Sequence, residues 1–149
     1  MDRLPNVAGR DGAAAPGTVK TIRSALVLAA GALALTGCAS GPSYAVLDRA
    51  AGDEDALPSE LPASATEGAD AETARFAGEH EDVALWLLRS EEPGGICLLA
   101  FRDPADWRKG CAGADLTVDG TLGAFTVVRD GGTPPAGATQ VSENVYALS

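Results

Sequence analysis

The chain has 149 residues, with 21 acidic against 11 basic side chains and a formal net charge of −10. A surface of this sign repels nucleic acid phosphates and anionic lipid headgroups, so no nucleic acid partner is expected. The length allows one small domain with additional segments.

A short apolar run lies near the N-terminus, directly after two basic side chains. Lys20 and Arg23 precede residues 25–35, which contain no polar side chain. This order is typical of a secretory signal peptide. A helix of that length rises only about 16 Å, against roughly 30 Å of bilayer hydrocarbon. We therefore expect an export signal rather than a membrane-spanning helix.

The apolar run ends in Leu35, Thr36, Gly37 and Cys38. These four residues resemble the lipobox of bacterial lipoproteins, which reads Leu, a small residue, Gly or Ala, and Cys. The resemblance implies that the Cys38 thiol receives a diacylglyceryl group and that cleavage falls between Gly37 and Cys38. Two acyl chains hold a protein stably on a membrane, whereas one does so only reversibly. The expected location is therefore the extracytoplasmic face of the cell membrane, anchored through lipid on Cys38.

The first eighteen residues differ from a compact basic signal start. They carry two acidic residues, two prolines and three glycines. We expect translation to begin at Val19 and residues 1–37 to be removed as the signal peptide. The remaining 112 residues hold 19 acidic and 7 basic side chains, a net charge of −12.

Two cysteines remain once Cys38 is assigned to lipid. Cys97 and Cys111 belong to a chain exported to an oxidising compartment, where a disulfide is expected. The bond closes a 15-residue loop and contributes about 3 kcal/mol in the chain-entropy model. A redox pair needs C-x-x-C spacing and a metal site needs added histidines, but His80 is the only histidine in the chain. No cofactor or metal is expected.

Residues 38–71 are acidic and poor in large apolar side chains. Between positions 48 and 70 there are seven acidic residues and a single basic one. Because so little apolar surface is available to offset the loss of chain entropy, we predict a flexible tether. Residues 44–47 form a short apolar patch that can dock on the domain. Residues 53–55 lack the glycine and distal glutamate of a calcium-binding loop, and are expected to be a solvated charge run.

Residues 72–149 are predicted to form a small β domain. Two apolar runs, 83–89 and 96–101, are separated by a turn signal at 91–95 and predict a hairpin buried on both faces. Residues 74–80 are expected as its antiparallel neighbour. A helical stripe over 76–88 is the alternative, and both interpretations stay open.

The rest of the domain shows weaker strand patterns. We expect a turn at 103–107, strands at 115–120 and 124–128, a loop at 130–137 and a last edge strand within 141–148. The fold class is mainly β, a small antiparallel sheet of four to six strands with at most one short helix, stapled by the disulfide. The large side chains predicted to be buried are Trp86, Phe101, Trp107, Phe125 and Tyr146.

The region of the second disulfide cysteine also carries a resemblance. Trp107, Gly110 and Cys111, spaced as they are after Cys97, resemble small uncharacterised lipoproteins of high-GC Gram-positive bacteria. This resemblance implies no particular activity.

No catalytic constellation is recognisable. The chain has no G-x-S-x-G nucleophile motif, and His80 lies between Glu79 and Glu81, where an exposed histidine is expected. We therefore expect no enzyme, but a surface binding or accessory module for a protein or another envelope component. The alternative is a small enzyme or ligand-binding lipoprotein. An exposed apolar patch would favour the module, and a concave pocket with converging carboxylates would favour the alternative.

Overall fold

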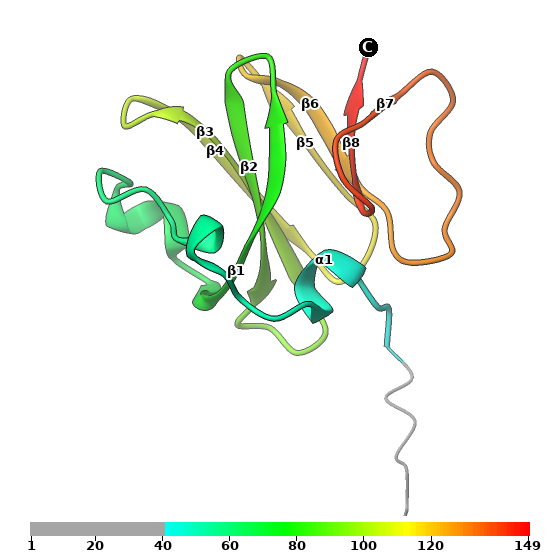
Figure 1. Ribbon diagram of the computed structural model, residues 1–149, viewed down its shortest axis with the longest axis horizontal. Helices are drawn as coiled ribbons and strands as arrows, with labels where there is room; N and C mark the ends of the chain where they lie inside the picture. Colours follow the sequence, from blue (N-terminus) through cyan, green and yellow to red (C-terminus); the bar gives the residue numbers. More distant parts are fainter. Residues whose placement is uncertain (1–40) are drawn as a thin grey trace, which may run out of the picture. The chain divides into compact units, whose positions relative to one another are not determined.

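The computed structural model describes residues 41–149, which form two antiparallel four-stranded sheets (Figure 1). Sheet A has the order β1 (Ala69–His80), β2 (Val83–Ser90), β3 (Ile96–Asp103) and β4 (Asp106–Ala112). Sheet B has the order β5 (Leu116–Gly120), β6 (Gly123–Val127), β8 (Val145–Leu148) and β7 (Thr139–Gln140). The helical elements of this part of the chain are α1 (Ala45–Asp48) and two 3-10 helices, η1 (Asp53–Asp55) and η2 (Ala63–Thr66).

This architecture confirms the mainly β, antiparallel class with one short α-helix, although eight strands in two sheets replace the expected four to six in one. The signal peptide, the start at Val19, the cleavage site at Gly37 and the lipidation site at Cys38 lie outside the described residues.

The β2–β3 hairpin forms the centre of sheet A, as its apolar runs predict. Leu87 pairs with Leu98, and Leu88 pairs with Cys97. All four side chains are fully buried. Successive side chains of a strand point to opposite faces, so a continuous apolar run requires cover on both faces of the sheet. The helical alternative for residues 76–88 is wrong, since these residues form the end of β1, a turn and most of β2. Strands are favoured because each face of sheet A packs against an apolar core.

The first core lies between the two sheets. Leu87 and Leu98 of sheet A share it with Phe125, Val127 and Val145 of sheet B, and each of these side chains is at most 1% exposed. Burying one such side chain contributes about 1.5–3 kcal/mol. This layer is the main apolar attachment of the sheets to each other.

The second core lies on the opposite face of sheet A. Trp86, Leu88 and Leu99 point there and pack against Leu61 and Ala65. Figure 1 shows the segment that holds η1 and η2 lying alongside sheet A.

The chain before β1 therefore belongs to the domain. Residues 43–68, here called the strap, contribute Tyr44, Val46 and Leu47 to the first core and Ala65 to the second. The prediction of a tether that extends to residue 71 is corrected accordingly. The apolar patch at 44–47 docks as expected, and the acidic stretch after it follows the sheet because polar side chains hold it there.

Acidic residues form two of the turns of sheet A. Glu81 and Asp82 join β1 to β2 with positive φ angles of 48° and 63°. A two-residue hairpin loop of this kind suits the twist of the strands but is usually built from Asn and Gly. The turn after Asp103 is held by its carboxylate, whose Oδ1 accepts the backbone N–H groups of Ala105 (2.8 Å) and Asp106 (3.0 Å).

The last strand is not an edge strand, which corrects the prediction for 141–148. β8 lies between β6 and β7, and the edge is the two-residue strand β7. Of the large side chains, Trp86, Phe101, Phe125 and Tyr146 are buried as predicted, whereas Trp107 is half-buried.

A close approach at one side of the sheets requires glycine. Gly78 of β1 has φ 115°, and a Cβ added there would lie 2.9 Å from Cγ1 of Val141, the residue after β7. Sheet A and the β7–β8 connection thus meet where a side chain would not fit.

Candidate binding surface

The Cys97–Cys111 disulfide is present, as predicted. The two residues face each other across β3 and β4, with their Cα atoms 4.0 Å apart. Cys97 is fully buried, whereas Cys111 is exposed. The bond therefore ties the outer strand β4 to the central strand β3 and completes the second core at its margin.

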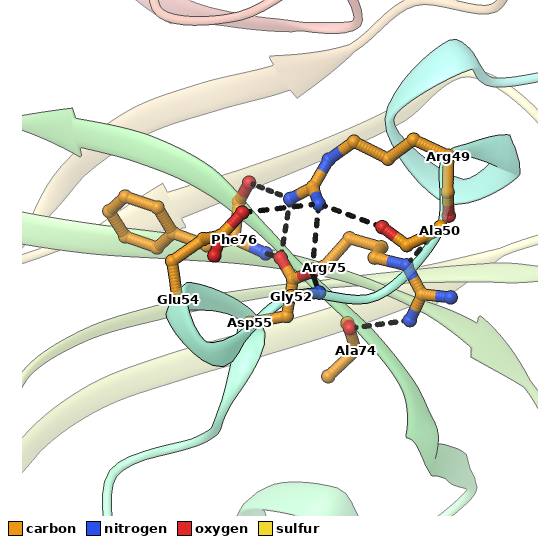
Figure 2. A network of polar contacts seen from close by, with 8 residues as sticks. All are labelled: Arg49, Ala50, Gly52, Glu54, Asp55, Ala74, Arg75 and Phe76. Atoms are coloured by element: carbon orange, nitrogen blue, oxygen red, sulfur yellow. Dashed lines mark hydrogen bonds and ion pairs between the residues drawn. The ribbon is translucent and has the colours of Figure 1, made fainter.

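The strap is fixed to β1 by a buried carboxylate. Asp55 is only 4% exposed. Its Oδ2 accepts the Gly52 N–H at 2.8 Å and its Oδ1 accepts the Phe76 N–H at 2.7 Å. The guanidinium of Arg49 forms an ion pair with both oxygens of Asp55 and donates to the Phe76 carbonyl at 3.1 Å (Figure 2). Because β1 is an edge strand, Phe76 has no neighbouring strand on its outer side. Asp55 and Arg49 instead bind its N–H and its carbonyl.

The environment of Asp55 changes its acidity. Burial by itself would raise the pKa of Asp55, but the hydrogen bonds from Arg49, Gly52 and Phe76 outweigh burial and lower the pKa to about 2. The same bond to Asp55 raises the pKa of Arg49. The predicted solvated charge run is confirmed for Asp53, which is exposed, and corrected for Asp55. No local sequence pattern predicts that Asp55 joins the strap to β1, because its contact to Phe76 spans 21 residues.

A second polar cluster fixes the beginning of the strap to sheet B. The Asn144 Oδ1 accepts the Val46 N–H at 3.0 Å, and its Nδ2 donates to the Asp130 Oδ1 at 2.8 Å. That oxygen also accepts the Ala45 N–H at 2.9 Å, while the Asp130 N–H donates to the Ser43 carbonyl at 2.9 Å. Burial alone would raise the pKa of Asp130, but the hydrogen bonds that its carboxylate accepts from Asn144 and Ala45 lower it. Sequence reasoning missed both Asn144 and Asp130.

His80 is placed differently from the expectation. It is half-buried rather than fully exposed, and its ring lies edge-on to Phe125 with 6.2 Å between ring centroids and an interplanar angle of 85°. The imidazole packs over the margin of the first core.

An aromatic surface lies on the outer face of sheet A. Phe76 pairs with Trp86, and the adjacent row aligns Ala84, Phe101 and Trp107. Phe76, Ala84 and Trp107 are half-buried, while Trp86 and Phe101 are each 6% exposed beneath them. The rings of Phe76 and Trp86 meet edge-on, with centroids 5.3 Å apart. These five residues are called the aromatic patch.

A cleft of about 410 Å³ lies between η1 and the irregular part of β1. Its charged lining residues are Asp53, Asp55 and Glu72, and the rest are glycine, alanine and one leucine. The Asp55 carboxylate is already engaged by Arg49 and Gly52 of the strap and by Phe76 of β1. Within residues 41–149, no group of three or more His, Cys, Asp or Glu side chains is arranged to hold a metal ion.

The chain matches no family model, no curated protein and no solved structure. In the part of the chain that the structure describes, no helix has the length and apolar character needed to cross a membrane.

Proposed function

We propose that this protein is a lipid-anchored extracytoplasmic binding module that presents the aromatic patch to a partner. The observation that carries the proposal is the half-buried state of Phe76 and Trp107 on a sheet that is otherwise covered on both faces. Apolar surfaces left open on a folded domain mark interaction sites, and aromatic side chains are enriched at the centres of such interfaces.

The proposed location at the membrane rests on the resemblance of residues 35–38 to a lipobox. A Cys97–Cys111 disulfide fits an oxidising compartment outside the cytoplasm. The strong negative charge keeps an anchored domain soluble.

The lipid anchor is tested with Cys38→Ala. Without the thiol, the precursor should stay uncleaved and unlipidated, which mass spectrometry of the intact protein detects. Normal cleavage after Gly37 and normal membrane retention in this variant would contradict the lipobox interpretation.

The patch is tested by affinity capture from intact membranes with the lipidated chain. Trp107→Arg should abolish capture of the partner, because a charged side chain at the centre of an apolar interface is left desolvated. The matched control is Thr117→Arg, an exposed position of sheet B, which should capture as well as the wild type. Thermal unfolding checks that both variants are folded. Equal capture by both arginine variants would contradict the proposal.

The cleft beside η1 supports a second candidate, a ligand-binding or enzymatic lipoprotein. Its free carboxylates belong to Asp53 and Glu72, both exposed. The test is complementation of cells that lack the protein. If the double variant Asp53→Asn with Glu72→Gln fails to restore the wild-type phenotype while Trp107→Arg restores it, this candidate replaces the first.

A further inference from the structure

The strap begins very close to the expected lipid. Ser43 is already fixed, because its carbonyl accepts the N–H of Asp130 at 2.9 Å. Only four residues separate Ser43 from Cys38. Five Cα–Cα steps cover at most about 18 Å even when fully extended. Lipid on Cys38 would therefore hold the end of the domain where the strap starts directly against the bilayer.

The position of the aromatic patch relative to this end follows from the strands. Gly41 and Ser43 border a cavity of about 300 Å³ together with Gly94, Gly95 and Ile96, so the strap starts beside the β2–β3 turn. Phe101 lies five residues further along β3, which corresponds to about 17 Å at strand spacing. Added to the reach of the spacer, this places the patch within about 35 Å of the bilayer surface.

The rim of the patch is acidic. Glu79 pairs with Ala84, Asp82 lies in the adjoining turn, and Asp103 follows Phe101 two residues later. Of the basic side chains near the patch, Arg102 binds Asp106 at 3.0 Å, and Lys109, which lies opposite Leu99, donates to the Glu67 carbonyl of the strap. An approaching surface with lysine or arginine side chains is electrostatically complementary to this rim.

We propose that the aromatic patch binds a basic extracytoplasmic segment of an integral membrane protein. This inference rests on the binding function proposed above and specifies its partner. The short spacer confines the patch to the layer in which the loops of membrane proteins lie, and such confinement raises the effective concentration of partners in the same membrane. The partner segment supplies an apolar side chain for the patch and cationic side chains for Glu79 and Asp82.

The experiment uses site-specific photocrosslinking in the native cells with the full chain and its own signal peptide. A benzophenone amino acid replaces Trp107, Ala84 or, as the control on sheet B, Thr117. Positions 107 and 84 should yield an adduct, and mass spectrometry should identify the captured partner as a protein that, without the crosslink, remains in the membrane after alkaline extraction and carries no lipid modification. Position 117 should not.

Two variants test the chemistry of that adduct. Glu79→Lys combined with Asp82→Lys should lower its yield at least about tenfold, which corresponds to about 1.4 kcal/mol, whereas Asp119→Lys combined with Glu143→Lys should not. Twenty Gly/Ser residues inserted between Gly41 and Pro42 should lower the yield about tenfold through effective concentration.

The outcomes separate this inference from the proposed function. An adduct with a soluble protein or an envelope polymer overturns the membrane partner and leaves the binding function standing. An adduct whose yield changes neither with the charge reversal nor with the longer spacer also overturns the inference. If neither position 107 nor position 84 gives an adduct, the binding function itself is overturned.

Discussion

The β2–β3 hairpin and the strap are held in the same domain by different kinds of interaction. The hairpin buries leucines on both faces, in contact with many apolar neighbours. The strap buries a smaller set of apolar side chains and is fixed in addition by a few polar side chains, chiefly Asp55 and Asn144, each of which binds backbone groups far away in sequence. An apolar layer spreads its free energy over many contacts, whereas a polar clamp loses most of its effect when one atom is changed.

The largest effect is expected from the centre of the hairpin. Leu98→Ala should lower the free energy of unfolding by about 3–4 kcal/mol, because it leaves a cavity in a fully buried layer. Denaturant unfolding measures the change. The matched control is Leu61→Ala in the half-buried part of the strap, for which a loss below about 1.5 kcal/mol is expected. Equal losses would show that apolar packing holds the strap as strongly as it holds the hairpin.

Removal of the disulfide should come next. Cys97→Ala combined with Cys111→Ala should cost about 3 kcal/mol by freeing the loop in the unfolded chain. The change is read from denaturant unfolding of the double variant and of the wild type under non-reducing conditions. A cost near zero would mean that the pairing of β3 with β4 alone determines the stability of this edge.

Asp55→Asn tests the clamp of the strap. The amide cannot neutralise Arg49 and cannot accept every bond that the carboxylate accepts, so a loss of about 2–3 kcal/mol is expected. Asp53→Asn, an exposed neighbour in the same 3-10 helix, should change stability by less than about 0.5 kcal/mol. Unchanged protection of the Phe76 amide from hydrogen exchange in Asp55→Asn would argue against the clamp.

Acid should destabilise the domain by protonating the carboxylate of Asp55. The pKa of Asp55 is about 2 in the folded domain, below an ordinary value near 4 in the unfolded chain. Its contribution is therefore complete above about pH 4 and is lost as the pH falls toward 2, by about 2 kcal/mol in total. Denaturant unfolding between pH 5 and pH 2 should show this slope in the wild type and a smaller one in Asp55→Asn.

The smallest expected effect is a gain in stability at the turn between β1 and β2. Asp82 has a positive φ of 63°, a conformation that costs a residue with a Cβ about 1 kcal/mol and glycine almost nothing. Asp82→Gly should therefore stabilise the domain by up to about 1 kcal/mol in thermal unfolding. The control is Asp103→Gly, which removes a carboxylate that holds its turn and should destabilise.

The sequence by itself determined the elements whose signal is local. Two apolar runs around residues 91–95 are sufficient for a hairpin, because strands buried on both faces need apolar side chains at every position. The pairing of Cys97 with Cys111 followed from counting cysteines, and the turn and loop residues marked most strand boundaries. The lipobox resemblance at Cys38 is likewise local.

Only the tertiary structure decided where residues 43–68 lie, which strand is at the edge of sheet B and which aromatic side chains remain open. The strap looked like a tether because its composition is acidic, yet one carboxylate, Asp55, satisfies the N–H of Phe76 and neutralises Arg49 at the same time. A hydrogen bond between residues far apart leaves no periodic pattern in either segment. The aromatic patch is hidden for the same reason, since the pairing of β1 with β2 and of β3 with β4 brings Phe76 and Trp107 to one face.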